Sequence, residues 1–106
     1  MLAKKDKDTV IAIAEKYNVK TVYLFGSSMG DPKLAHDIDL GVIGVTPPKF
    51  FQFYAELMRN LPKPVDLIDL SEKSLFNDLV KERGIKIYIR PPPKKKKNGR
   101  SKKKNK

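Results

Sequence analysis

Two short apolar runs, residues 22–25 and residues 38–45, most constrain what this chain can fold into. The first is β-branched and aromatic and stops at a glycine, and the second is also dominated by aliphatic side chains, so both are expected to be buried strands. Between them the chain turns through Gly26, Ser27 and Ser28. A glycine lets the backbone approach a ligand closely, and serines that open a short helix can direct hydroxyl and amide donors toward an anion. Gly26 and Ser27 are therefore candidates for holding a phosphate group.

Two aspartates lie where the second run begins. Asp37 and Asp39 are two residues apart, and the period of two in a strand places both carboxylates on one face. Neighbouring carboxylates repel each other, so one is pushed toward its neutral form unless a cation lies between them. The chain has no cysteine and one histidine, and hard oxygen ligands favour Mg²⁺ or Mn²⁺ over zinc. The pair therefore predicts a divalent metal site.

The order and spacing of these residues resemble a known family. Gly26-Ser27, nine intervening residues and then Asp37-Ile38-Asp39-Leu40 are similar to the Gly-Ser…Asp-x-Asp pattern of the DNA polymerase β-like nucleotidyltransferase superfamily. Over about residues 5–90 the chain looks like the minimal nucleotidyltransferases, stand-alone catalytic domains often paired with a HEPN partner in prokaryotic toxin–antitoxin modules. The resemblance implies an α/β (α+β) fold, with a small mixed sheet and packed helices as in the polymerase β palm. The stretch Ser28-Met29-Gly30-Asp31 and His36 depart from the residues that many relatives carry there.

The resemblance also implies a reaction. A nucleoside monophosphate, AMP if the donor is ATP, would move from an NTP to a hydroxyl group of an acceptor substrate. Asp37 and Asp39 would bind two Mg²⁺ (or Mn²⁺) ions, and Gly26 and Ser27 would hold the β- and γ-phosphates. A third carboxylate would bind the ion nearest the acceptor substrate.

Two aspartates of the next apolar run compete for the role of third ligand. Asp66 stands inside residues 65–68, where an unpaired carboxylate costs several kcal/mol unless it is bound or exposed at an edge. Asp69 lies where this strand gives way to a helix, and either Asp69 or Ser71 can cap that helix. Asp66 is therefore the preferred third ligand and catalytic residue, beside Asp37 and Asp39.

The size of the chain bears on its partner. With 106 residues there is room for one domain, expected over residues 1–90, and no room for a further acceptor-binding domain. The acceptor substrate is then expected on another polypeptide, a HEPN-type toxin by the resemblance, with a homo-oligomer as the other form of association. Two alternatives remain open: a catalytically weak antitoxin or scaffold that acts by binding, and a nucleic-acid-binding module.

The net charge of +11 is unevenly distributed. Residues 94–106 hold nine Lys or Arg and no acid, whereas residues 1–93 hold 14 Lys or Arg against 12 Asp or Glu. Residues 91–106 are expected to be a disordered basic tail. Such a tail can contact RNA, DNA or an acidic surface weakly and without sequence reading, or it can simply be solvated.

Three amphipathic helices and a final strand complete the expected fold. Their expected positions are a helix from a cap at Asp6 or Asp8 to Tyr17, a helix from Thr46 to Asn60, a helix over residues 72–83 and a strand over residues 85–89. No apolar run approaches the ~20 residues that span a bilayer, so a cytoplasmic protein without membrane contact is expected.

The helix over residues 46–60 has an unusually wide apolar arc. The arc is roughly 160° against the ~100° that one core contact needs. Either a small domain uses the whole arc to cover its sheet, or part of it is a subunit interface that includes Phe53 and Leu57. The arc contains Phe50, Phe51, Phe53, Tyr54, Leu57, Met58 and Leu61.

Overall fold

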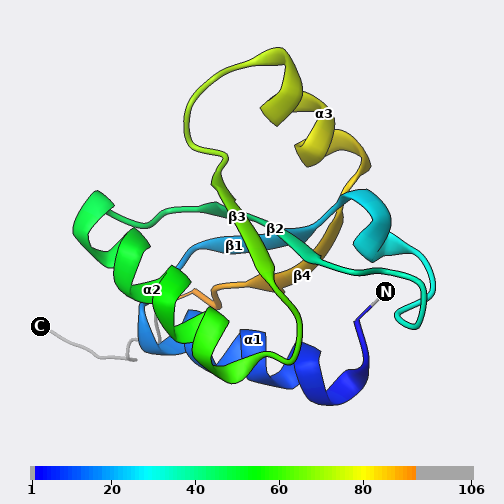
Figure 1. Ribbon diagram of the computed structural model, residues 1–106. Coiled ribbons are helices and arrows are strands. Elements are labelled where there is room, and N and C mark those ends of the chain that lie inside the picture. The colour runs from blue at the N-terminus through cyan, green and yellow to red at the C-terminus, as the bar shows by residue number, and fades with distance from the viewer. Residues whose placement is uncertain (1, 93–106) are drawn as a thin grey trace, which may run out of the picture.

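The structure is a computed structural model that describes residues 2–92. Within this part of the chain, a four-stranded sheet is combined with three α-helices and one 3₁₀ turn (Figure 1), which confirms the expected mixed α/β fold. In chain order the elements are α1 (Lys4–Lys16), β1 (Thr21–Leu24), η1 (Gly26–Met29), β2 (Ile38–Ile43), α2 (Pro47–Asn60), β3 (Val65–Asp69), α3 (Leu75–Arg83) and β4 (Ile85–Ile89). The expected basic tail lies almost entirely outside the described residues.

The sheet has the strand order β3-β2-β1-β4 and is mixed. Strand β1 pairs antiparallel with both β2 and β4, whereas β2 and β3 run parallel. A parallel pair needs a crossover connection, which α2 supplies. This arrangement brings the starts of β2 and β3 to the same end of the sheet as the end of β1, where Leu24 lies opposite Leu40.

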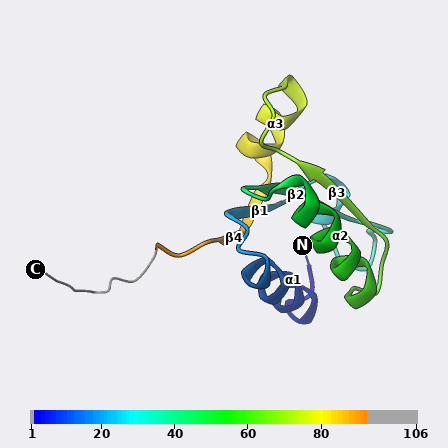
Figure 2. The same ribbon diagram turned by 90° about the vertical axis from the view of Figure 1, so that its left-hand side faces the viewer.

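Helices α1 and α2 lie side by side against one face of the sheet, and α3 stands on the other side (Figure 1 and Figure 2). Alternate residues of the strands point into the main core between the sheet and these two helices. The second face carries a smaller apolar cluster, in which Tyr23, Leu70 and Val80 are buried. Fully buried side chains of the main core include Val10, Leu24, Leu40, Val42, Phe53 and Leu57.

The wide apolar arc of α2 is divided between the core and the surface. Phe53 and Leu57 are fully buried, so the alternative that placed them in a subunit interface is wrong. The arc is wide because α2 packs against α1 as well as against the sheet, with the Phe53 ring edge-on to Tyr17 at 6.0 Å between centroids. Only the outer margin is exposed, at Phe51 (71%) and Met58 (56%).

The N-cap of α2 is Thr46, as predicted, but the N-caps of α1 and α3 differ from the predicted ones. Helix α1 has Ala3 at its N-cap, with no side-chain cap, and Asp8 instead pairs with Lys4 at 2.8 Å. Helix α3 begins at Leu75, later than expected, because the Ser74 hydroxyl accepts a hydrogen bond from the Asn77 amide at 3.0 Å. The expected caps at Asp6 or Asp8, and at Asp69 or Ser71, are therefore wrong.

None of the helices in residues 2–92 combines the length and the apolar character required to cross a bilayer.

Candidate active site

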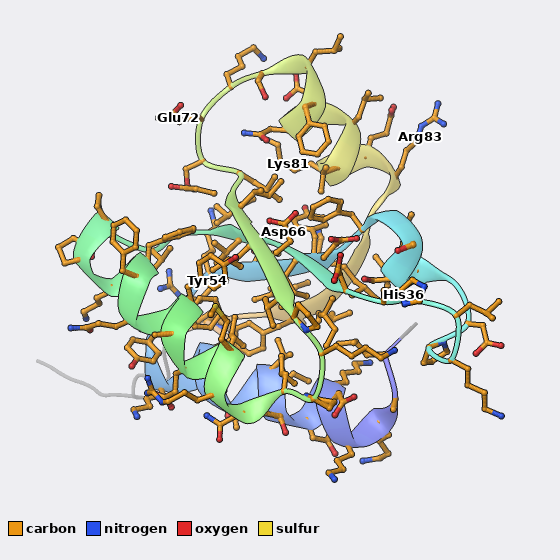
Figure 3. All side chains as sticks on the ribbon, in the orientation of Figure 1. His36, Tyr54, Asp66, Glu72, Lys81 and Arg83 are labelled. Carbon is orange, nitrogen blue, oxygen red and sulfur yellow. The ribbon has the colours of Figure 1, made fainter. Side chains whose placement is uncertain are left out.

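The carboxylates that were predicted to bind metal lie together at the end of the sheet where β2 and β3 begin. Asp39 and Asp66 are directly opposite each other in the parallel pair, and Asp37 comes one residue before β2. Because Val65 and Leu67 point into the main core, strand alternation places Asp66 on the opposite face, on the side of α3 (Figure 3). Asp37 and Asp66 are exposed, and Asp39 is half-buried.

The turn after β1 passes directly over Asp39. The Phe25 amide donates to the Asp39 carbonyl oxygen at 3.1 Å, and Gly26 follows with φ of +64°. A Cβ atom at residue 26 would lie 2.7 Å from Asp39 Oδ2. Gly26 is therefore needed for two reasons: the left-handed conformation of the turn and the close approach of its backbone to the Asp39 carboxylate.

Ser28 connects the turn to the backbones of both aspartates at the start of β2. Its side chain is buried (2% exposed), and its hydroxyl accepts from the Asp39 amide at 2.8 Å and donates to the Asp37 carbonyl oxygen at 3.0 Å. From the sequence, Ser28 was placed in the turn and in the stretch that departs from many relatives, and this bridging role was not predicted. The sequence did contain a hint of this role, because a second serine follows the Gly-Ser pair directly. Which of the two serines bonds to the start of β2, however, is decided by the 3₁₀ turn.

Gly26 and Ser27 are exposed at the start of η1, beside the carboxylates. Their position leaves the backbone of the turn accessible to a ligand on the Asp39 side. That these two residues hold a phosphate group remains a prediction.

The pKa of Asp39 is affected by its burial and by the two neighbouring aspartates. Partial burial raises the pKa of the Asp39 carboxyl, and the neighbouring carboxylates of Asp66 and then Asp37 raise it further. One of the neighbouring carboxylates was expected to be pushed toward its neutral form, and Asp39 is that group. A cation at this place would relieve the repulsion.

The three aspartates have the ligand chemistry that a divalent metal ion requires, but their side chains are not arranged in advance to hold one. Among residues 2–92, no three side chains of Asp, Glu or His are arranged so that they could hold a metal ion. Mg²⁺, however, is usually bound by one or two carboxylates together with substrate phosphates and water, and seldom by an all-protein cage. The donor set and the raised pKa of Asp39 therefore fit a divalent ion that arrives with a nucleotide.

Asp69 has a different environment from Asp66. It ends β3, and its Oδ1 accepts from the Ser71 amide at 2.9 Å in a local turn. Its register partner in β2 is Val42, toward the far end of that strand from Asp39. Asp69 therefore has a structural role in the turn, and Asp66 stays the preferred third ligand.

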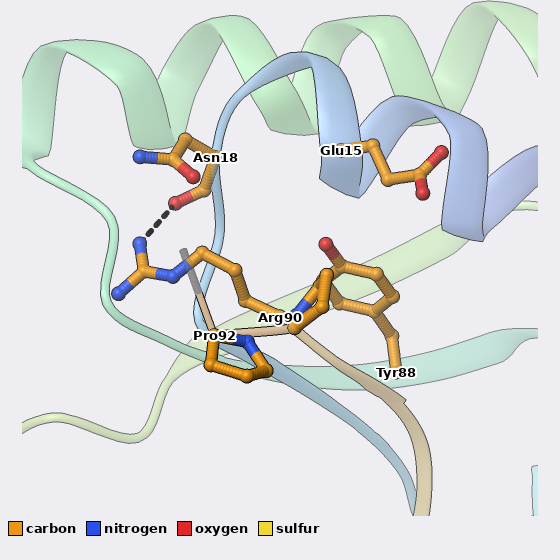
Figure 4. Close-up of a pocket in the computed structure, with 6 residues that line it drawn as sticks. Glu15, Asn18, Tyr88, Arg90 and Pro92 are labelled. Carbon is orange, nitrogen blue, oxygen red and sulfur yellow. Dashed lines mark hydrogen bonds between the residues drawn. The ribbon is translucent and has the colours of Figure 1, made fainter. Parts of the chain in front are cut away.

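A hollow of about 540 Å³ lies at the opposite end of the sheet, where β4 ends. Asn18, Tyr88 and Arg90 contribute to its lining, and the Arg90 guanidinium donates to the Asn18 carbonyl oxygen at 3.0 Å (Figure 4). None of the predicted site residues lines it, so it is separate from the carboxylates.

Solved structures share this fold. A crystal structure of the toxin–antitoxin MntA–HepT contains a chain that is 20% identical, with a TM-score of 0.63 over 82% of this chain and 73% of that one. The tri-AMPylated HEPN toxin of Shewanella oneidensis in complex with the MNT antitoxin gives 22% identity and a TM-score of 0.63, covering 81% and 71% of the two chains. A toxin–antitoxin structure with AMP-PNP gives 22% identity and a TM-score of 0.63, covering 78% and 73%.

The likeness to these structures shows a shared fold. Residues 8–92 also match the family model described as Polymerase beta, Nucleotidyltransferase, which spans most of the chain. The chain belongs to this nucleotidyltransferase family, as its motif spacing indicated. No curated protein sequence matches the chain.

Proposed function

We propose that this protein transfers a nucleoside monophosphate, AMP from ATP in the first instance, to a hydroxyl group of a HEPN-type partner protein. The observation that carries the proposal is the pairing of Asp39 with Asp66 beneath the Gly26 turn, where the pKa of Asp39 is raised by burial and by the other two carboxylates. Membership of the nucleotidyltransferase family supports the reaction class. The choice of AMP and of a HEPN acceptor rests on the similar structures, one of which contains an AMPylated HEPN toxin and another AMP-PNP.

The residues of the site would divide the work. Asp37, Asp39 and Asp66 would hold two Mg²⁺ (or Mn²⁺) ions, which supply charge neutralisation at the triphosphate and a lower pKa at the attacking hydroxyl. The exposed amides and hydroxyl of Gly26 and Ser27 would bind the β- and γ-phosphates. Ser28 keeps the Asp37 and Asp39 backbones in a fixed relation, because its hydroxyl bonds to both.

The bond changes are those of an in-line displacement. The acceptor oxygen forms a bond to the α-phosphorus, and the bond from that phosphorus to the bridging oxygen of pyrophosphate breaks. Asp66 would take the hydroxyl proton, because the third carboxylate is the one expected nearest the acceptor and Asp66 is exposed on the site face of β3. The acceptor hydroxyl would come from a second polypeptide, in the cytoplasm by this proposal, since one of the similar structures contains an AMPylated HEPN toxin.

Calorimetric titration with Mg²⁺ and each NTP tests the site. Asp39→Asn should abolish the metal-dependent part of NTP binding, and Asp66→Asn should abolish transfer to the acceptor protein while the fold is retained. Asp69→Asn is the matched control on the same strand and should cost at most ~1 kcal/mol of stability. NTP binding that ignores both the metal and Asp39→Asn would contradict the proposal, as would loss of transfer in Asp69→Asn alone.

A second candidate function is an antitoxin or scaffold that keeps the fold and acts by binding its partner. It is favoured by one observation: the stretch Ser28-Met29-Gly30-Asp31 departs from the residues that many relatives carry after the Gly-Ser pair. The same titration separates the two candidates, because a binding-only protein would associate with the HEPN partner without metal-dependent NTP binding. A role in contacting nucleic acid would rest on residues 94–106, which the structure does not describe.

A further inference from the structure

Lys63 connects the segment between α2 and β3 to the loop that leads into the site. Its side chain is half-buried, and its ammonium group donates hydrogen bonds to the carbonyl oxygens of Pro32 and Ala35, the latter at 2.7 Å. Both carbonyls belong to the loop of residues 30–37, which runs from η1 to β2. Lys63 therefore closes this loop from a segment about 30 residues further along the chain.

A second contact from the same segment holds the end of the loop. The Ile38 amide donates to the Pro64 carbonyl oxygen at 2.8 Å. Asp37 lies between the residues held by Lys63 and this contact, and its own carbonyl accepts a hydrogen bond from the Ser28 hydroxyl. The backbone of Asp37 is thus fixed by three connections, of which Lys63 makes the outermost.

The other contacts of the loop cannot replace Lys63. The Asp31 carbonyl and carboxylate accept from the amides of Leu34 and Lys33, but these bonds are local to the tip of the loop. In the described part of the chain, no carboxylate forms an ion pair with the Lys63 ammonium. Its charge is therefore directed at the two loop carbonyls, and hydrogen bonds from a charged donor are stronger than neutral ones.

We propose that Lys63 is a positioning residue of the nucleotidyl transfer site: it fixes the loop of residues 30–37 so that Asp37 presents its carboxylate beside Asp39. The inference rests on the proposed function, and it adds a residue outside the motif. Lys63 acts through the loop backbone and does not contact the reacting atoms in this account. Its influence is therefore expected on the affinity of the site for Mg²⁺-NTP.

Three variants test the inference in the full-length protein. Lys63→Met keeps the aliphatic stem and removes the donors, and it should raise KM for Mg²⁺-NTP about tenfold with a smaller change in kcat. Lys63→Arg keeps a charged donor that can reach both carbonyls, and it should recover KM to within about threefold of the wild type. Lys7→Met removes an exposed α1 lysine and should leave both parameters unchanged.

A second readout separates this inference from the proposed function. In Lys63→Met, hydrogen exchange should accelerate at the Ile38 and Asp39 amides, which the Pro64 carbonyl and the Ser28 hydroxyl protect. It should not accelerate in the β1–β4 pair. If the wild type transfers no nucleotide, the proposed function fails, and the exchange data still decide whether Lys63 holds the loop.

If the wild type is active and Lys63→Met matches it in KM and in exchange, the positioning role is wrong. A lower melting temperature with unchanged KM would also overturn it, because a purely structural contact would lower stability alone.

Discussion

Replacing Gly26 by alanine should damage the site more than the fold. An alanine at φ of +64° costs about 1–2 kcal/mol in the left-handed conformation. For a domain of this size, that cost corresponds to a fall in melting temperature of roughly 4–16 °C. The new Cβ would also stand 2.7 Å from Asp39 Oδ2, so the carboxylate must move away from the place it shares with Asp66. NTP binding in the presence of Mg²⁺ should then weaken at least about tenfold, the loss of roughly one charge-assisted contact.

Gly44 provides a matched control. It has φ of +83°, and a Cβ there would lie 2.5 Å from Lys20 Cβ, at the other end of β2. Gly44→Ala should therefore lower the melting temperature at least as much as Gly26→Ala without touching the carboxylates. Thermal melts followed by calorimetry below both melting temperatures compare the two variants. Normal affinity in Gly26→Ala, or an equal loss in Gly44→Ala, would refute the reasoning.

Three further predictions concern the site and the core. Ser28→Ala leaves the part-buried Asp39 amide without its partner, so it should cost about 1–3 kcal/mol in chemical denaturation and weaken Mg²⁺-NTP binding; unchanged values would contradict the bridging role. The pKa of Asp39 is raised above its ordinary 3.8, so its ionisation should destabilise the metal-free protein as pH rises through that raised value. Asp39→Asn should accordingly melt above the wild type near about pH 7 but not near about pH 3, and equal differences at both pH values would argue against this. Phe53→Ala should cost ~3–5 kcal/mol because the ring is fully buried, whereas exposed Phe51→Ala should change stability by less than ~0.5 kcal/mol, as denaturant titrations would show.

The elements that carry the motif could be predicted from sequence because their signals are local. The apolar run of residues 22–25 ends at a glycine, and the run of residues 38–45 begins beside an aspartate. Together these signals specify two strands and the turn between them. The family resemblance predicted a third carboxylate on the next strand, but the parallel pairing of Asp39 with Asp66 was not predicted. Periodicity alone does not determine which strands become neighbours or in what register.

Other features depend on tertiary contacts that the local sequence does not contain. The arc of α2 could not be divided between core and surface until its contact with α1 was known, because the whole arc is apolar. Several residues could cap α3, and the choice of Ser74 depends on where β3 ends. The roles of Ser28 and Lys63 were missed for the same reason, since each bonds to backbone atoms at least nine residues away.

The most direct test of the account is the mass of a HEPN-type partner after incubation with this protein, Mg²⁺ and each NTP. The account predicts that the partner gains the mass of one or more nucleoside monophosphates, with ATP as the expected donor. The gain should require Mg²⁺ or Mn²⁺, disappear with Asp39→Asn and persist with Asp69→Asn. A partner that binds the protein but gains no mass with any NTP, or that is modified equally well by Asp39→Asn, would contradict the assignment of this carboxylate site to nucleotidyl transfer.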